Sequence, residues 1–195
     1  MKTLIAAVVA LLLTALPAWA DGELDKLLSA FDKDRLARFE TIRKEALKEA
    51  RAGGNATDLK TLDSALAGTP LPMSGSFDAS GNWRCRTVKV GGLLPLVVYP
   101  WFKCSIADDG SGWFLKKTTG SQMTQGRFYT ESDTRLVYLG AGHVRGDNPR
   151  KYGEAPKEDQ VAIAERLAEN RLVLQFPAPQ YESKFDLLVM ERVTR

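Results

Sequence analysis

The spacing of apolar residues divides the chain into a helical part and a strand-rich part. Over residues 21–72 apolar side chains recur every three or four positions, as at Leu36, Phe39 and Ile42, and this spacing predicts a pair of amphipathic helices. Over residues 73–195 apolar and polar positions mostly alternate, which predicts half-buried strands. We therefore expect an α+β fold in which the helical pair packs on a mainly antiparallel sheet, with binding of a partner by the helices as the alternative.

Seven runs in the second part have strand-like alternation. They occupy residues 82–90, 96–107, 112–118, 126–131, 134–144, 171–176 and 185–193. Turn signals such as Asp108-Asp109-Gly110 separate them, and short antiparallel strands at this spacing predict a barrel-like sheet. The segment at about 157–169 has apolar residues at helix-like spacing, so we expect one helix within this domain.

The first 20 residues differ from both parts. Lys2 precedes an apolar core over residues 4–13, and the Ala-Trp-Ala run at residues 18–20 fits a small-x-small cleavage site. The apolar core is shorter than the roughly 20 residues that span a bilayer. This pattern predicts a secretory signal peptide that is cleaved after Ala20, a periplasmic mature protein, and no membrane span in the mature chain.

Composition limits the classes of partner. The chain has 27 Lys and Arg residues against 24 Asp and Glu residues, a formal net charge of +3, and loss of Lys2 with the signal peptide lowers this charge further. A nearly neutral chain lacks the concentrated basic patch that nucleic acid usually requires, so we expect no nucleic-acid partner. The sequence contains neither a phosphate-binding loop nor a calcium loop, and we expect no cofactor and no metal.

The two cysteines, Cys85 and Cys104, predict a structural disulfide. Export to an oxidising compartment favours disulfides, and the spacing fits neither a zinc site nor a C-x-x-C redox pair. Alternation places both cysteines on the inward faces of two strands. If they lie directly opposite each other in an antiparallel pair, they are within reach of a bond. Free thiols are the alternative.

Several runs of the chain resemble those of a known family. They are GNWRCRTVK, YPWFKCSI, TTGSQMTQGRFY, RLVYLGAG and ESKFDLLVMERV. Together they resemble a family of exported proteins of Gram-negative bacteria that is classed as a domain of unknown function. The similarity covers essentially the whole mature chain. Because this family has no assigned activity, ligand or catalytic residue, the resemblance implies no function.

A second resemblance covers the sheet region alone. Gly81-Asn82-Trp83 is similar to the G-x-W that opens the first strand of lipocalin-like (calycin) barrels. In that superfamily a basic side chain of the last strand covers the tryptophan, and the resemblance implies that Arg192 covers Trp83 here. Small bacterial protease inhibitors of the superfamily also combine a G-x-W with one disulfide and export. Inhibition of a hydrolase is therefore one functional hypothesis, by analogy of fold.

Three further residues are candidates for function. Alternation directs Tyr99 and Trp101 to the face opposite Cys104, where they either lie beneath the N-terminal helices or form a contact patch for a ligand or a protein. His143 is the one histidine, and it could act as a general base only beside a positioned nucleophile or carboxylate.

These observations leave three functional hypotheses and predict no catalytic residue. The leading hypothesis is a non-enzymatic binding module for a small apolar molecule or for an envelope protein. The second is an inhibitor of a periplasmic or secreted hydrolase. The third is an enzyme of unrecognised type that uses His143.

Overall fold

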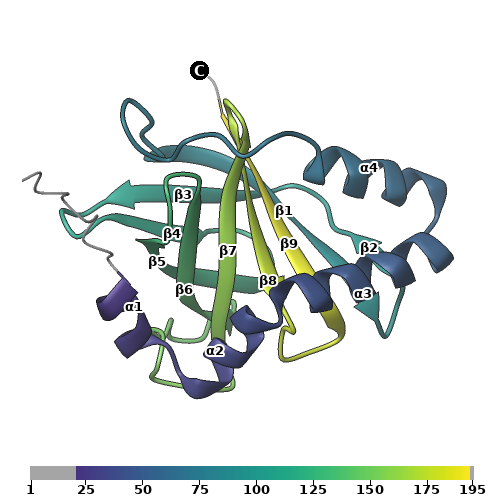
Figure 1. Cartoon of the computed structure of the whole chain (residues 1–195), viewed down its shortest axis with the longest axis horizontal. Helices are drawn as coiled ribbons and strands as arrows, with labels where there is room; N and C mark the ends of the chain where they lie inside the picture. The colour runs from purple at the N-terminus through teal and green to yellow at the C-terminus, as the bar shows by residue number, and fades with distance from the viewer. Residues whose placement is uncertain (1–20, 194–195) are drawn as a thin grey trace, which may run out of the picture.

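The computed structural model describes residues 21–193, which form four helices followed by nine strands (Figure 1). The predicted signal peptide lies outside the described residues. The helices are α1 (Asp21–Leu27), α2 (Ala30–Ala37), α3 (Phe39–Gly53) and α4 (Ala56–Leu66). Side chains cap two of them: Ser29 accepts a hydrogen bond from the backbone N–H of Asp32, and Asn55 accepts one from the backbone N–H of Asp58. Within residues 21–193 no helix combines the length and the apolar character that crossing a membrane would take.

The strands form one antiparallel sheet that closes on itself. They are β1 (Gly81–Gly92), β2 (Leu96–Val98), β3 (Phe102–Asp108), β4 (Trp113–Lys117), β5 (Gln122–Thr130), β6 (Arg135–Val144), β7 (Asp159–Ala168), β8 (Arg171–Pro177) and β9 (Ser183–Arg192). From β3 onward each strand pairs with the next, and β1 pairs with both β3 and β9. The result is an eight-stranded barrel with β2 as one extra strand, which confirms the predicted α+β class and the barrel.

The helix predicted at residues 157–169 is wrong, because this segment forms strand β7. Val161 and Ile163 are buried on the outer side of the barrel beneath the helices, whereas Ala162 and Ala164 are buried inside it. A strand that is buried on both faces has a continuous apolar run instead of an alternating one. Such a run has the same apolar spacing as a buried helix, so periodicity alone cannot separate the two.

Two hydrophobic cores share the wall of the barrel. The inner core fills part of the barrel and contains the disulfide, Trp83 and Tyr138. The outer core lies between the helices and the outer faces of the strands, where Val88 and Val189 are buried. Strands β1 and β6 to β9 have buried residues in both cores, so they contribute apolar surface on both of their faces.

Helix α3 covers the outer face of the barrel where β1, β8 and β9 lie side by side, and α4 lies beside β2 (Figure 1). Ala46 and Ala50 are fully buried, and these small side chains let the helix lie close to the strands. Phe39 begins the helix, and its ring packs edge-on against Phe185 of β9 with centroids 5.7 Å apart. The predicted packing of the helical part on the sheet is therefore confirmed for α3.

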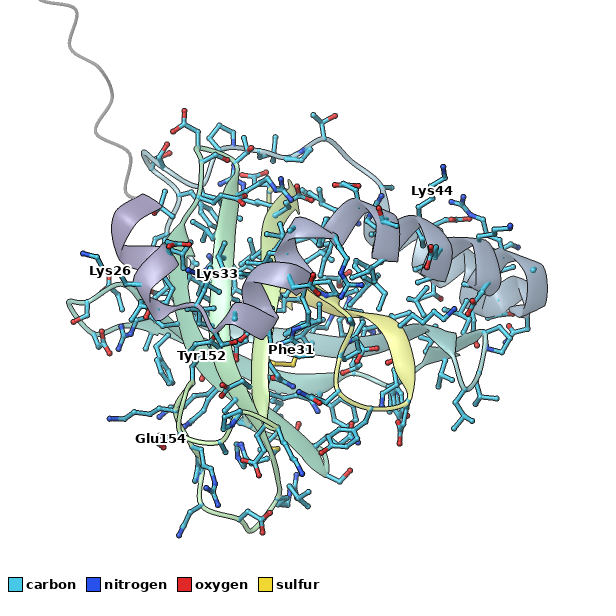
Figure 2. All side chains as sticks on the ribbon, turned by 60° about the horizontal axis from the view of Figure 1, so that its bottom comes forward. Lys26, Phe31, Lys33, Lys44, Tyr152 and Glu154 are labelled. Carbon is cyan, nitrogen blue, oxygen red and sulfur yellow. A yellow bond between two sulfur atoms is a disulfide. The ribbon has the colours of Figure 1, made fainter. Side chains whose placement is uncertain are left out.

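The Cys85–Cys104 disulfide is confirmed, and it joins β1 to β3 inside the barrel (Figure 2). The two residues are not directly opposite each other. In the observed register Cys85 faces Phe102 and Trp83 faces Cys104, so the disulfide joins diagonal neighbours whose Cα atoms are 5.9 Å apart. This distance is within the usual range for a disulfide. The long connection from β1 to β3 through β2 sets this register, which the turn residues alone do not reveal.

Replacing both cysteines by alanine should lower the free energy of unfolding by about 3 kcal/mol, because the bond closes a loop with a sequence separation of 19. Urea denaturation followed by tryptophan fluorescence measures this change. Reductant should lower the stability of the wild type by a similar amount and leave the double variant unchanged. Equal stability of the oxidised wild type and the double variant would contradict a stabilising role.

Candidate functional site at the open end of the barrel

The two ends of the barrel differ, and Trp83 occupies the closed end. Its indole N–H donates to the backbone oxygen of Ala79 at 2.9 Å, and the guanidinium of Arg192 lies 4.6 Å from the centre of its ring. Arg192 also donates to the backbone oxygen of Ser80 at 2.7 Å and to that of Asp78. The structure therefore brings the predicted pair, Trp83 and Arg192, into contact where the chain enters β1 and leaves β9.

The opposite end of the barrel contains a cavity of about 360 Å³, here called the open-end cavity. It lies where β4 and β8 end and where β5, β7 and β9 begin, and Figure 2 turns this lower end of Figure 1 toward the viewer. The side chains that line it include those of Thr87, Lys89, Lys117, Thr124, Gln160, Phe176, Asp186 and Leu188.

Tyr138 is fully buried beneath the floor of the open-end cavity, where it contacts the lining residues Thr124 and Phe176. A Cβ atom on Gly140 would overlap its hydroxyl, and one on Gly126 would lie 2.7 Å from its Cζ atom, so glycine at both positions makes room for the ring. The ring packs against Phe128 and Phe176 with centroid distances of 5.5 Å and 5.9 Å. Because these rings, Trp83 and the disulfide occupy the inner part of the barrel, the space for a ligand is confined to the open end.

A short hydrogen-bond chain runs from Tyr138, beneath the floor, to Thr124 and Gln160 in the wall of the open-end cavity. The hydroxyl of Thr124 donates to Oε1 of Gln160 at 2.6 Å and lies 2.7 Å from the hydroxyl of Tyr138. Threonine has only one hydroxyl hydrogen, so Tyr138 is the donor to Thr124. Burial raises the pKa of Tyr138, which keeps this donor protonated. The chain satisfies the polar groups on one side of the cavity.

Asp186 and Lys89 face each other across the β1–β9 pair and line the same cavity. Ser183 donates its hydroxyl to Oδ1 of Asp186 at 2.6 Å, yet burial raises the pKa of Asp186 to about 6. Burial acts on Lys89 in the opposite direction, but its ion pair with Glu182 and the nearby charge of Asp186 outweigh that effect and raise its pKa. Lys89 is therefore a protonated lysine whose charge is balanced by neighbouring carboxylates in the wall of the cavity.

Lys117 points inward from the last position of β4 and is only 7% exposed. Its ammonium donates to the backbone oxygen of Gln122 and lies 4.2 Å from the centre of the Phe102 ring. Burial, followed by the charge of Arg145, lowers the pKa of Lys117 to about 8. Among residues 24–193 no carboxylate lies within ion-pair distance of this ammonium.

A buried polar cluster fixes α2 beside the open-end cavity. Arg35 is 2% exposed, forms an ion pair with Asp32, and lines the cavity. Its guanidinium also donates to the backbone oxygen of Ala178 at 3.3 Å, in the β8–β9 connection. Tyr152 donates its hydroxyl to Asp32 and accepts a hydrogen bond from the backbone N–H of Ser29 at 3.1 Å, beside the segment that joins α1 and α2 (Figure 2). These contacts join α2 to two of the connections around the cavity.

His143 lies at the rim of the cavity, where it pairs with Met123 in the β5–β6 register. Its Nδ1 atom is buried and has no hydrogen-bond partner, and the described residues include no carboxylate or hydroxyl bonded to its ring. The orienting partner that a general base requires is therefore missing from the described structure. The same residues contain no group of three or more His, Cys, Asp or Glu side chains that could hold a metal ion.

Tyr99 and Trp101 lie on different sides of the sheet. The Tyr99 ring is 6.0 Å from the ammonium of Lys89, a cavity residue. The Trp101 ring lies beside the guanidinium groups of Arg84 and Arg86, at 4.5 Å and 4.0 Å, and packs against the outer core beneath the helices. The structure does not bring these two aromatic residues together.

The sequence reasoning missed the charged residues of the cavity. Lys117 and Asp186 occupy inward positions two residues from Leu115 and Leu188, which are buried inside the barrel. Two lysines and an aspartate at inward positions of apolar strands are unusual, because burying a charge is costly unless it is paired. These charged residues at positions where the alternation predicts apolar ones were the feature of the sequence that could have indicated the site.

Comparison with known proteins identified one family. The family model described as Domain of unknown function (DUF4893) matches residues 26–190. No match was found among curated proteins or among solved structures. The similarity to lipocalin-like barrels, which concerns residues 81–83, therefore has no support from a solved relative.

Replacing Asp186 by asparagine should stabilise the protein at neutral pH. The pKa of this carboxyl rises from 3.8 to about 6 on folding, so the folded protein favours the protonated form. With respect to this group, the wild type is therefore most stable below about pH 4, and it loses stability as the pH rises through about 6. We expect Asp186→Asn to be more stable than the wild type by up to about 3 kcal/mol at about pH 7, and the two proteins to converge at about pH 4. Urea denaturation across this range measures the difference.

Asp63→Asn is the matched control, because this side chain is 63% exposed. Its stability should follow that of the wild type at each pH. A constant difference between Asp186→Asn and the wild type at all pH values would contradict titration of Asp186 as the cause.

Proposed function

The chain belongs to the family described as Domain of unknown function (DUF4893), whose description names no activity, and we propose from the geometry that it is a non-enzymatic binding module for a small molecule. The ligand binds in the open-end cavity. The volume of this cavity, about 360 Å³, is the observation that carries the proposal. It lies within the range of about 300–1,000 Å³ that is typical of ligand sites.

The lining of the cavity supports an amphipathic ligand instead of a purely apolar one. Phe176 and Leu188 supply apolar surface next to the floor. Lys117, Asp186 and Gln160 supply charged and polar groups at the walls. Sites for small molecules combine an apolar lining with a few convergent polar groups in this way. The proposal therefore departs from the small apolar molecule that the sequence suggested.

The perturbed ionisation of the cavity residues supports the same proposal. Lys117 and Asp186 both line the cavity. Burial lowers the pKa of Lys117 and raises that of Asp186, and both shifts favour the neutral form of the side chain. Burial of an ionisable group lowers the stability of the folded protein. Such groups are found preferentially at sites where a ligand or a reaction uses them. The disulfide is compatible with the periplasmic location that we propose for the protein, because disulfides persist in oxidising compartments.

The alternative of hydrolase inhibition would use a protruding segment. The β1–β2 connection is the candidate, because Leu93 and Leu94 are 80% and 57% exposed. An exposed pair of leucines is compatible with contact to a protein, but it leaves the buried charges of the open-end cavity without a role. We therefore prefer small-molecule binding.

The test uses N-phenyl-1-naphthylamine, a neutral dye whose fluorescence rises in apolar surroundings. We expect saturable binding of one dye per protein chain. Thr87→Phe should weaken this binding at least tenfold, because the new ring would occupy the cavity that Thr87 lines. Ala107→Phe is the matched control: Ala107 is exposed near the other end of the barrel, and this variant should bind the dye like the wild type.

Circular dichroism and thermal unfolding would show that both variants fold. Absence of saturable binding by the wild type, or equal binding by Thr87→Phe and Ala107→Phe, would contradict a ligand site in the open-end cavity.

A further inference from the structure

The two lysines that line the open-end cavity differ in what balances their charge. Lys89 forms an ion pair with Glu182 and has Asp186 opposite it in the next strand. In the part of the chain that the structure describes, the ammonium of Lys117 contacts the backbone oxygen of Gln122 and the face of the Phe102 ring, and no carboxylate. Strand β3 separates β1 from β4, so the carboxylates that balance Lys89 belong to a different part of the wall. The charge of Lys117 therefore has no anionic partner in the described chain.

A second cation lies beside Lys117. The guanidinium of Arg145 donates to the backbone oxygen of Gly120 at 2.9 Å. Gly120 belongs to the β4–β5 turn, which runs from Lys117 to Gln122. Lys117 and Arg145 are close enough for their charges to repel. Gly120 has a φ of +103°, and a Cβ atom there would lie 2.9 Å from the Lys117 ammonium. The turn thus holds two cations close together, and within the described residues their hydrogen-bond acceptors are neutral backbone oxygens.

Four acidic side chains line the cavity. Asp147 is exposed and forms no ion pair within residues 24–193, with Lys117 or any other cation, and the other three have partners of their own. Glu158 forms an ion pair with Arg150 at 3.5 Å. Asp159 accepts a hydrogen bond from the backbone N–H of Gly153 at 2.9 Å. Asp186 accepts one from Ser183 and lies opposite Lys89. None of these carboxylates supplies the missing charge at Lys117.

We infer that the ligand of the open-end cavity is a small amphipathic anion whose acidic group pairs with the ammonium of Lys117. This inference rests on the proposed function, because it requires that the cavity binds a ligand. A buried cation without a counter-ion is costly, and an anionic group placed at Lys117 removes part of that cost. Hydrogen bonds between charged groups are also stronger than those between neutral groups. The apolar part of the ligand then lies against Phe176 and Leu188.

The test compares two dyes that differ by one acidic group. The probe 8-anilino-1-naphthalenesulfonate is N-phenyl-1-naphthylamine with an added sulfonate. We expect the wild type to bind the sulfonate dye more tightly than the neutral one. Lys117→Met keeps the length of the side chain and removes its charge. It should weaken the sulfonate dye by about tenfold or more and change the neutral dye by less than about twofold.

Lys116→Met is the matched control. Lys116 is the preceding residue of the same strand, it is exposed, and it points away from the cavity, so its loss should leave both dyes unaffected. Lys117→Arg should retain most of the preference for the sulfonate dye, because it keeps the positive charge. If Lys117→Met does not fold, as judged by circular dichroism, Lys117→Gln provides the same comparison.

The possible outcomes separate the inference from the proposed function. If the wild type binds both dyes equally and Lys117→Met changes neither, the anion inference is overturned and the binding function stands. If neither dye binds in a saturable way, both are overturned. Loss of the sulfonate dye in Lys117→Met with unchanged binding of the neutral dye supports both.

Discussion

The pairing of β1 with β9 is the constraint on which the rest of the structure depends. Its register runs from Trp83 opposite Arg192 at one end to Gly92 opposite Ser183 at the other. This one pairing joins the first and last strands, removes the two open edges of the eight-stranded sheet and encloses an interior. It also places Lys89 directly opposite Asp186, so the charged wall of the open-end cavity exists only in the closed barrel.

The outer face of the same pair gives the N-terminal helices their place. Val88 of β1 and Val189 of β9 are buried on that face, and α3 covers them with the small side chains Ala46 and Ala50. Burial on both sides of the barrel wall adds apolar area that a barrel of this size would otherwise expose to water. The helices are therefore part of the stability of the barrel, and the cluster of Arg35 and its partners extends this support to the rim of the cavity.

The open-end cavity combines a rigid floor with walls that cost stability. Tyr138 and the aromatic rings around it fill the inner part of the barrel, so the floor is a packed core. Above it, Lys117 has no anionic partner among the described residues, and burial raises the pKa of Asp186 to about 6. Proteins keep such local violations mainly where function requires them, and the proposed anion site at Lys117 would be one such place.

By itself the sequence determined the α+β class, a barrel-like sheet and the pairing of its two cysteines, because the spacing of apolar residues and the cysteine content are read directly from the chain. The closure of the sheet and the diagonal register of the disulfide were decided by the tertiary structure. The sequence also indicated family membership through runs such as YPWFKCSI. Only the tertiary structure decided that residues 159–168 are a strand, because burial on both faces removes the alternation that identifies one. Only the tertiary structure assembled the cavity, since Lys117 and Asp186 lie on strands far apart in the sequence. The closure of the barrel is the physical event that brings them to one site.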